Sequence, residues 1–260
     1  MRQNHTLAQI RAGEPAIGLW LQSHSHHTAR IIAAQGLFDW LVVDLEHTPV
    51  DVHTAATTLG AIADVSGGMC TPLVRVAQGT MHNIKYALDF GAQGVIVPMV
   101  NTAEDAQQVV RYARYPPDGD RGGGGLLPHL SYGVAKHVEF LPHGNRETLV
   151  AVQIETRQAV ENIEAIADVP GIDLVFVGPM DLHLSLGLPA TLWSDSPVFL
   201  SALGRVVDAC QSRGIPLGTL APNAELAKAR LADGFTFVGM GSDYGHLLAA
   251  LHAQVQQLKS

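Results

Sequence analysis

Short apolar runs alternate with segments of helical periodicity along the whole chain. Eight runs rich in Val, Ile and Leu are predicted strands, at residues 16–21, 40–45, 72–76, 94–99, 149–154, 174–177, 215–219 and 235–240. Their nearly continuous apolar character is typical of parallel strands that are buried on both faces. Helical patterns lie between them, at residues 27–35, 51–65, 81–90, 102–114, 197–213, 224–232 and 243–258, and a further one follows Glu155.

Eight strand–helix units in 260 residues predict a closed (β/α)₈ barrel, a fold that takes about 250 residues. We expect one domain over residues 1–260, because no linker divides the chain. The alternative is an open doubly wound sheet. That fold requires a glycine-rich phosphate turn after its first strand, and none follows Leu21.

The segment at about 115–147 interrupts the alternation. It contains RYPPDGDRGGGG, in which the run Gly122–Gly125 neither follows a predicted strand nor precedes a helix. The run therefore lacks the context of a dinucleotide or nucleotide-phosphate motif, and no nucleotide cofactor is expected. Two interpretations of the segment at about 115–147, including its glycine-rich part at 119–125, stay open: a flexible loop and a lid over an active site.

Composition restricts the class of protein further. The net charge of -8 argues against a nucleic-acid partner. Cys70 and Cys210 lack metal-binding spacing, which favours reduced thiols. The polar start has no apolar signal core, and no apolar run approaches the roughly 20 residues of a membrane span. We expect a cytoplasmic protein that acts on a small molecule and has no membrane partner.

Two carboxylates follow neighbouring predicted strands. Glu155 comes directly after the fifth strand, and Asp181 follows the sixth. Because parallel strands end at the same edge of a sheet, both carboxylates are expected on one rim. Such a pair is typical of a site for Mg²⁺, Mn²⁺ or a similar dication. The alternative is that each acid stabilises the first turn of the following helix.

Other strand ends carry candidate catalytic groups. His47 follows Asp44 and Glu46 after the second strand, and Arg75 ends the third. A histidine beside carboxylates on the catalytic rim is a candidate base, and a buried guanidinium can stabilise an oxyanion. The alternatives are a structural histidine and a buried salt bridge.

The first loop and the lysines add two further expectations. His24, His26 and His27 form either a separate metal site or the lining of the active-site mouth. No lysine ends a strand: the chain has only Lys85, Lys136, Lys228 and Lys259. A barrel aldolase that forms a Schiff base needs such a lysine, so any carbanion chemistry here is expected to depend on a metal.

Several motifs together resemble those of the HpcH/HpaI class II pyruvate aldolases. They are DLEH at 44–47, PLVRV around Arg75, LDFG at 88–91, VPMV, RYPPDGDRG, VQIET and FVGPMDL, in that family's order and spacing over nearly the whole chain. The resemblance implies a barrel of the phosphoenolpyruvate/pyruvate type and reversible retro-aldol cleavage of a 4-hydroxy-2-oxo acid to pyruvate and an aldehyde. The alternative is an oxaloacetate decarboxylase or another metal-dependent carbon–carbon lyase.

The resemblance also implies roles for single residues at the pyruvate end. Glu155 and Asp181 would bind a divalent cation, Mg²⁺, Mn²⁺ or Co²⁺, that holds the 2-oxo acid. Gln153 and the backbone at Met180 and Asp181 would hold the pyruvate carboxylate, and Arg75 would stabilise the enolate oxygen.

The remaining implied roles concern the base and the aldehyde end. His47 would act as the base through a water molecule, with Asp89 raising its basicity. Asp44 would contact the aldehyde or hydroxyl end. The other substrate contacts would be Trp20, Leu220 and Arg121.

The family's usual assembly is a hexamer built from dimers that exchange their C-terminal helices, and the resemblance implies the same here. Met180 and His183 replace smaller residues of the family pattern, and the first loop carries extra histidines. Met180 is expected to narrow the pocket. These departures leave the acceptor aldehyde undetermined.

Overall fold

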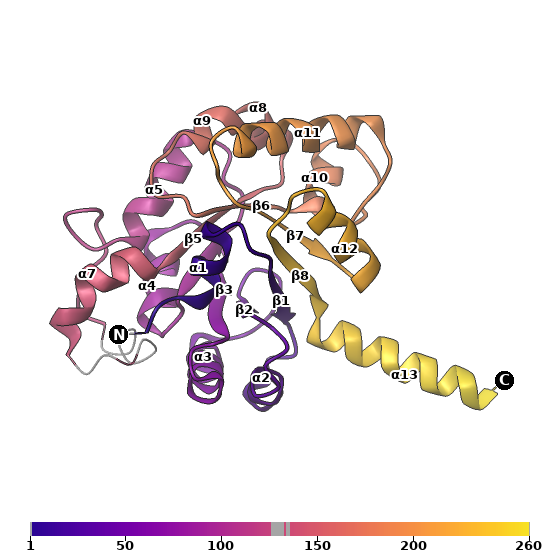
Figure 1. The fold of residues 1–260 in the computed structure, drawn as a ribbon, viewed down its shortest axis with the longest axis horizontal. Coiled ribbons are helices and arrows are strands. Elements are labelled where there is room, and N and C mark those ends of the chain that lie inside the picture. Colours follow the sequence, from indigo (N-terminus) through magenta and orange to yellow (C-terminus); the bar gives the residue numbers. More distant parts are fainter. Residues whose placement is uncertain (1, 126–132, 134–135, 260) are drawn as a thin grey trace.

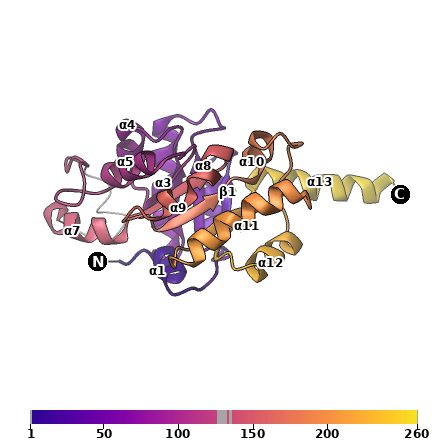
Figure 2. The ribbon, with the colours of Figure 1, turned by 90° about the horizontal axis from the view of Figure 1, so that it is seen from above.

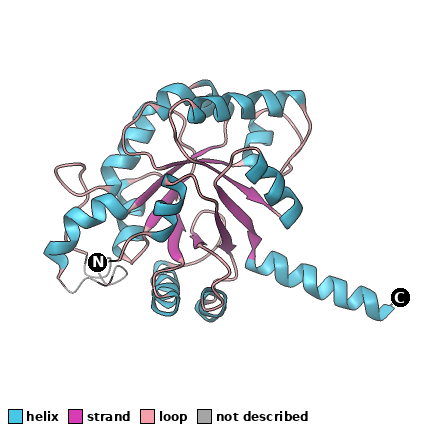
Figure 3. Cartoon of the chain, in the orientation of Figure 1, coloured by secondary structure: helices cyan, strands magenta, loops and turns pink. Residues whose placement is uncertain are grey.

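The computed structural model describes residues 2–125, 133 and 136–259 and contains a closed barrel of eight parallel strands in the order β1 to β8 (Figures 1 and 3). The predicted (β/α)₈ fold is thereby confirmed. The strands are β1 (Ala16–Leu21), β2 (Trp40–Asp44), β3 (Thr71–Arg75), β4 (Gly94–Val97), β5 (Leu149–Ile154), β6 (Leu174–Val177), β7 (Leu217–Ala221) and β8 (Phe237–Ser242).

Helices surround the barrel, as Figures 1 and 3 show. Those in the described part of the chain are α1 (His5–Arg11), α2 (His26–Ala33), α3 (Val52–Ser66), α4 (Met81–Asp89), α5 (Ala103–Ala113), α7 (His137–Glu147), α8 (Arg157–Glu161), α9 (Ile163–Ala167), α10 (Pro179–Ser185), α11 (Pro197–Gln211), α12 (Ala224–Ala232) and α13 (Asp243–Lys259). A bilayer span would require a longer and more apolar helix than any of these.

The last two strands begin two residues later than predicted. The reason is that the backbone N–H groups of Ile215 and Phe235 are used to end the preceding helices. Ile215 donates to the carbonyl of Cys210 at 3.0 Å, and Phe235 donates to that of Arg230 at 3.1 Å. The shift carries Leu220 into β7 and places the end of β8 at Ser242.

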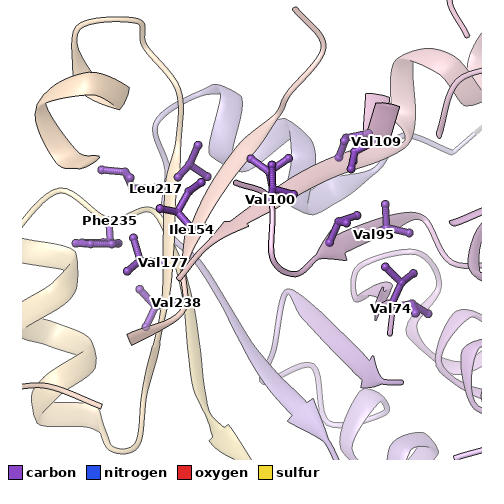
Figure 4. Close-up of a cluster of buried hydrophobic side chains, with 14 of the residues drawn as sticks. Val74, Val95, Val100, Val109, Ile154, Val177, Leu217, Phe235 and Val238 are labelled. Carbon is purple, nitrogen blue, oxygen red and sulfur yellow. The ribbon is translucent and has the colours of Figure 1, made fainter. Parts of the chain in front are cut away.

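The apolar side chains form an inner and an outer layer. Trp40, Leu73, Phe176 and Phe237 fill the barrel interior, and the Trp40 and Phe237 rings stack at 4.1 Å between centroids. The alternate residues of each strand face outward and pack against the helices, as the valines around Val95 do in Figure 4. This alternation of inward and outward residues determines which strand-end side chains enter the barrel.

Helix α1 closes the end of the barrel where the strands begin. Asn4 donates its side-chain amide to the carbonyl of Gln93 at 2.9 Å, and the Thr6 hydroxyl donates to that of Asp39 at 2.8 Å. Leu7 and Ile10 join the inner apolar layer. Helix α1 therefore covers this end of the interior, and we refer to the carboxyl ends of the strands as the open end.

The described part of the segment at 115–147 lies away from that open end. The backbone N–H groups of Asp120 and Arg121 donate to the carbonyls of Arg111 and Arg114, at the end of α5. Helix α5 runs from the open end of the barrel back toward the starts of the strands, so residues bonded to its C-terminal end lie far from the open end. The described part of the segment therefore does not form a lid over the open end of its own chain. Residues 126–132 and 134–135, on which the lid interpretation also falls, lie outside the described residues.

The C-terminal helix α13 projects from the barrel (Figures 1 and 2). Its main contacts are with β1 and β8, and Asp243 is its only described residue that is buried. Five apolar side chains along it are exposed, at Leu247, Leu248, Leu251, Val255 and Leu258. The helix therefore has an apolar face without a partner among the described residues.

Candidate active site

The inward-facing residues of three strands lead directly to polar groups at the open end. Val42 belongs to the inner layer, and Asp44 follows two residues later on the same face of β2. Leu73 leads in the same way to Arg75 on β3, and β5 leads to Gln153. Asp44 and Arg75 are direct partners in the register of β2 and β3. The period of the strand thus brings these side chains together.

A cavity of about 390 Å³ occupies the open end of the barrel. Six of the residues expected in the site line it: Trp20, Arg75, Gln153, Met180, Asp181 and Leu220. The buried Nε1 of Trp20 and Oε1 of Gln153 have no hydrogen-bond partner among the described residues. Unpaired polar atoms in a cavity wall are available to a bound ligand.

Glu155 is a buried carboxylate just past the end of β5, with 2% of its surface exposed. One oxygen accepts the backbone N–H of Met99 at 2.8 Å, and the other accepts the side-chain amide of Gln153. Burial raises the pKa of Glu155 to about 7, and the negative charges of Glu46 and Asp181 add to the rise. A carboxylate in this position is stabilised by a bound cation.

The donor set fits a divalent cation. Asp181 lies in the first turn of α10, close enough to Glu155 to influence its pKa. No described basic side chain forms an ion pair with Glu155. Gly178 keeps the space beside the carboxylate open, because a methyl group there would lie 2.6 Å from Glu155 Oε2. These are the properties of a site for a hard dication with oxygen ligands.

Within the described residues, no group of three His, Cys, Asp or Glu side chains is arranged as a metal site. A dication held by Glu155 and Asp181 would therefore take its other ligands from water or substrate, as such cations commonly do. The same finding is evidence against a separate site in the first loop. Ser25 caps α2 there, and the rings of His26 and His27 lie 4.1 Å apart, while none of the loop histidines lines the cavity.

Arg75 is held between two acids and an aromatic ring. It donates to both oxygens of Asp44, at 2.9 and 2.6 Å, and its third nitrogen lies 3.2 Å from Glu46 Oε2. Its guanidinium carbon lies 4.4 Å from the centre of the Trp20 ring. Burial alone would raise the pKa of Asp44, but Arg75 and the hydrogen bond from Gln22 lower it below its ordinary value. Asp44 is thus the anionic partner that orients Arg75.

This position of Asp44 differs from the expected contact with the aldehyde end. The residue is 0% exposed and does not line the cavity. Its oxygens are occupied by Arg75, Gln22 and the backbone N–H of Glu46. A substrate in the cavity would touch Arg75 and leave Asp44 behind it.

Glu46 is a site residue to which sequence analysis assigned no role. Its carboxylate lies between Arg75 and His47, 3.7 Å from Nε2 of His47. Burial raises the pKa of Glu46 against the opposing effect of Arg75. In the sequence, the only indication of a role for Glu46 is its position between the candidate residues Asp44 and His47. Its burial arises from contacts with a neighbouring strand, which the local sequence does not reveal. His47 itself is 58% exposed and sits at the edge of the site.

Asp89 and Arg121 lie at the opposite end of the barrel. Asp89 is the last residue of α4, a helix that runs from the open end back toward the strand starts, and Arg121 donates to it at 3.0 Å. Arg121 is buried and lies over the ring of Tyr115. Neither residue lines the cavity. The expected contacts of Asp89 with His47 and of Arg121 with the acceptor are therefore not formed within one chain.

The first two turns of α13 form part of the cavity wall, which the sequence pattern did not indicate. Asp243 accepts the backbone N–H groups of Gln22 and Ser23 at 2.9 and 3.2 Å, and this joins α13 to the end of β1. Gly245, His246 and Ala249 consequently line the cavity. The three are more than 200 residues from β1 in sequence, so no local signal marks them.

Known proteins provide an independent comparison. The chain is 39% identical over 251 residues to 4-hydroxy-2-oxo-heptane-1,7-dioate aldolase of Shigella sonnei (strain Ss046), covering 96% of this chain and 93% of the relative. It is 38% identical over 249 residues to 2-keto-3-deoxy-L-rhamnonate aldolase of Klebsiella pneumoniae subsp. pneumoniae, covering 95% and 90%.

Comparison with a solved structure leads to the same family as these relatives. The crystal structure of an HpcH/HpaI aldolase/citrate lyase family protein from Burkholderia cenocepacia J2315 superimposes with a TM-score of 0.91 at 33% identity, covering 99% of this chain and all of the other. The resemblance noted in the motifs is confirmed. The profile of the HpcH/HpaI aldolase/citrate lyase family matches residues 16–250, and the chain, a carbon–carbon lyase of the aldolase type, belongs to that family.

Proposed function

We propose that this aldolase cleaves a 4-hydroxy-2-oxo acid reversibly to pyruvate and an aldehyde. The observation that carries the proposal is the presence at one barrel end of two carboxylates, the buried Glu155 and the half-buried Asp181, together with the fixed guanidinium of Arg75. Bond cleavage between C3 and C4 of such a substrate leaves an electron pair that is delocalised onto the C2 oxygen. Arg75 supplies positive charge near the developing oxyanion, and a cation held by the two carboxylates would supply more.

Glu155 and Asp181 would hold the cation, which we propose is Mg²⁺, Mn²⁺ or Co²⁺. When bound, it would supply Lewis-acid polarisation of the 2-oxo acid. Gln153 positions Glu155 through its amide hydrogen bond, and its Oε1 has no hydrogen-bond partner among the described residues. The helix start at Met180 and Asp181 offers backbone N–H groups to a carboxylate. No described lysine lines the cavity, which supports this chemistry over a Schiff base.

Arg75 would stabilise the enolate oxygen. Its position is set before the substrate binds, because Asp44 holds two of its nitrogens and the Trp20 ring packs against it. A preorganised donor stabilises charge without reorganisation during the reaction. Asp44 and Trp20 therefore serve the reaction by positioning Arg75.

His47 would remove the proton of the C4 hydroxyl. As that proton leaves, the O–H electrons form the aldehyde carbonyl and the C3–C4 bond breaks. Return of a proton to C3 then gives pyruvate, and the reverse sequence joins pyruvate to an aldehyde. Glu46, 3.7 Å from the His47 ring, is placed to stabilise its protonated form.

The proposed reaction predicts metal-dependent release of pyruvate from 4-hydroxy-2-oxo acids. Treatment with a chelator should lower the rate by roughly 10²–10³-fold, since the cation contributes several kcal/mol, and Mg²⁺, Mn²⁺ or Co²⁺ should restore it. Pyruvate is measured by coupling to lactate dehydrogenase. Full activity after chelation would contradict the proposal.

Oxaloacetate is assayed in parallel, because its decarboxylation produces the same enolate. Faster release of pyruvate from oxaloacetate than from every hydroxy acid tested would make the protein a decarboxylase instead.

We further propose that α13 packs against a second copy of this chain, and that six chains assemble as a trimer of dimers with exchanged C-terminal helices. The apolar face of α13, exposed in one chain, supports this arrangement. The placement of Asp89 is consistent with assembly, because a contact with His47 requires two chains. Location in the cytoplasm agrees with Cys70 and Cys210, which are buried and unpaired.

The assembly proposal predicts that Leu251→Glu combined with Val255→Glu reduces the mass in solution toward that of one chain, 27.7 kDa. Charges on this face would have to be buried without partners in the interface, which is strongly unfavourable. Ala253→Glu, on the opposite face of α13, is the matched control and should keep the assembled mass. Light scattering at several protein concentrations measures the mass of each variant. A wild-type protein that has the mass of a single chain at every concentration would contradict the proposal.

A further inference from the structure

The cavity is larger and more apolar than a three-carbon acid requires. At about 390 Å³ it is within the range of sites that enclose much larger ligands. Arg75, Gln153 and Asp181 line it from β3, β5 and α10. Across the barrel, the wall is formed by Leu192, Leu220, Pro222 and Ala249, with Met180 beside them. The site therefore has a polar part for the 2-oxo acid and an apolar part for the group attached to C4.

Among the described residues of one chain, the apolar part of the cavity contains no free cation. Arg75 is the only arginine or lysine among the described residues that line the cavity, and Asp44 and Glu46 hold it. His246 also lines the cavity, but its Nε2 is bonded to the carbonyl of Met240 at 2.6 Å. A second carboxylate on the substrate would thus lose water without gaining a cationic partner, which is unfavourable.

Leu192 is held in the wall by a fixed segment between α10 and α11. Trp193, its neighbour, packs edge-on against Phe199 with centroids 5.2 Å apart. The guanidinium carbon of Arg230 lies 3.2 Å from the centre of the Trp193 ring. On the other side of Trp193, Ser194 bonds to Nε2 of His183 at 2.8 Å.

His183 is itself fixed, which explains this departure from the family pattern. It is fully buried, bonds to the carbonyl of Pro179 at 2.6 Å and stacks on Phe199 at 4.0 Å. The ring therefore joins the start of α10, which carries Asp181, to the segment that carries Leu192. These contacts fix the position of the apolar wall relative to the acidic site.

We infer that the acceptor is an uncharged, apolar aldehyde, and that Leu192 is a specificity-determining residue for it. The inference rests on the proposed aldol reaction and adds the substrate class. It predicts an acceptor that differs from that of the Shigella sonnei relative, whose named substrate carries a second carboxylate. For this chain, that carboxylate would face Leu192 and Leu220.

The test compares acceptors in the aldol direction, with pyruvate and Mn²⁺ held constant. Pentanal and succinic semialdehyde have similar length and differ in an apolar end against a carboxylate. We expect kcat/KM for pentanal to exceed that for succinic semialdehyde by at least about tenfold, and kcat/KM to rise about fourfold for each CH₂ from propanal to pentanal. Equal values, or preference for succinic semialdehyde, would overturn the inference.

Leu192→Arg should lower the ratio of kcat/KM for pentanal to kcat/KM for succinic semialdehyde by about tenfold or more, because it places a cation in the apolar wall. Leu200→Arg is the control, since Leu200 is exposed on α11 and does not line the cavity, and its ratio should match the wild type. Leu192→Ala provides a smaller change and should weaken the dependence on chain length. An unchanged acceptor ratio in both Leu192 variants would overturn the role of this residue.

Exchange of the pyruvate C3 hydrogens with D₂O, followed by NMR, reports on enolate formation without any aldehyde. Exchange together with preference for succinic semialdehyde would reject the apolar acceptor while supporting the proposed function. Absence of both exchange and addition would reject the proposed function and, with it, this inference.

Discussion

A Glu155→Gln variant is expected to lose pyruvate-forming activity by roughly 10²–10³-fold or more and, without metal, to become more stable at pH 8. The two effects have one cause, the burial of an acid whose pKa is raised to about 7. Glutamine keeps the shape of the side chain but removes the charge that a cation requires. Steady-state assays with saturating Mn²⁺ measure the first effect, and thermal unfolding in chelator measures the second.

The sign of the stability change follows from proton linkage. The folded protein holds the Glu155 proton more tightly than the unfolded chain, so the free energy of unfolding falls as pH rises from the ordinary glutamate value near 4.5 to about 7. The full loss is on the order of 3 kcal/mol and is complete above pH 7. Glu155→Gln should lack this loss.

Glu164→Gln is the matched control. Glu164 pairs with Arg205 on the surface, and such pairs contribute about 0–1 kcal/mol. Activity and pH dependence should stay close to those of the wild type. A Glu155→Gln protein that kept metal-dependent activity would exclude Glu155 as a ligand.

Arg75→Met is expected to lower kcat by about 10²–10³-fold and to reduce stability by about 3–5 kcal/mol. The loss of rate reflects a missing donor to the enolate oxygen. The loss of stability arises because Asp44 stays buried as a charge without its partner, while Glu46 loses its cation. Initial rates and urea unfolding measure the two quantities.

A second substitution separates these effects. Asp44→Asn in the Arg75→Met background removes the unpaired charge and should recover much of the stability, but none of the rate. Arg75→Lys keeps the charge but lacks the paired donors that bind Asp44, so it should restore only a fraction of the activity. Recovery of rate in the double variant would exclude Arg75 from the reaction.

Much of the fold is predictable because strand patterns are local. Buried parallel strands are recognised from their own residues, and the eight of them in 260 residues leave few architectures. The cavity-lining positions of Arg75, Gln153 and Asp181 follow from the same rule, since parallel strands end at one rim. The errors at β7 and β8 arose where Ile215 and Phe235 form backbone hydrogen bonds with the preceding helices.

The sequence by itself determined the barrel, the acidic pair Glu155 and Asp181, and the resemblance that led to the family, because all three depend on short-range periodicity and motif order. Only the tertiary structure decided that Asp44 lies behind Arg75, that Asp89 is at the far end and that Leu192 lines the acceptor wall. The positions of these residues depend on how side chains from different strands and helices pack against one another. That packing is defined by residues far apart in sequence, so it exists only once the barrel has closed.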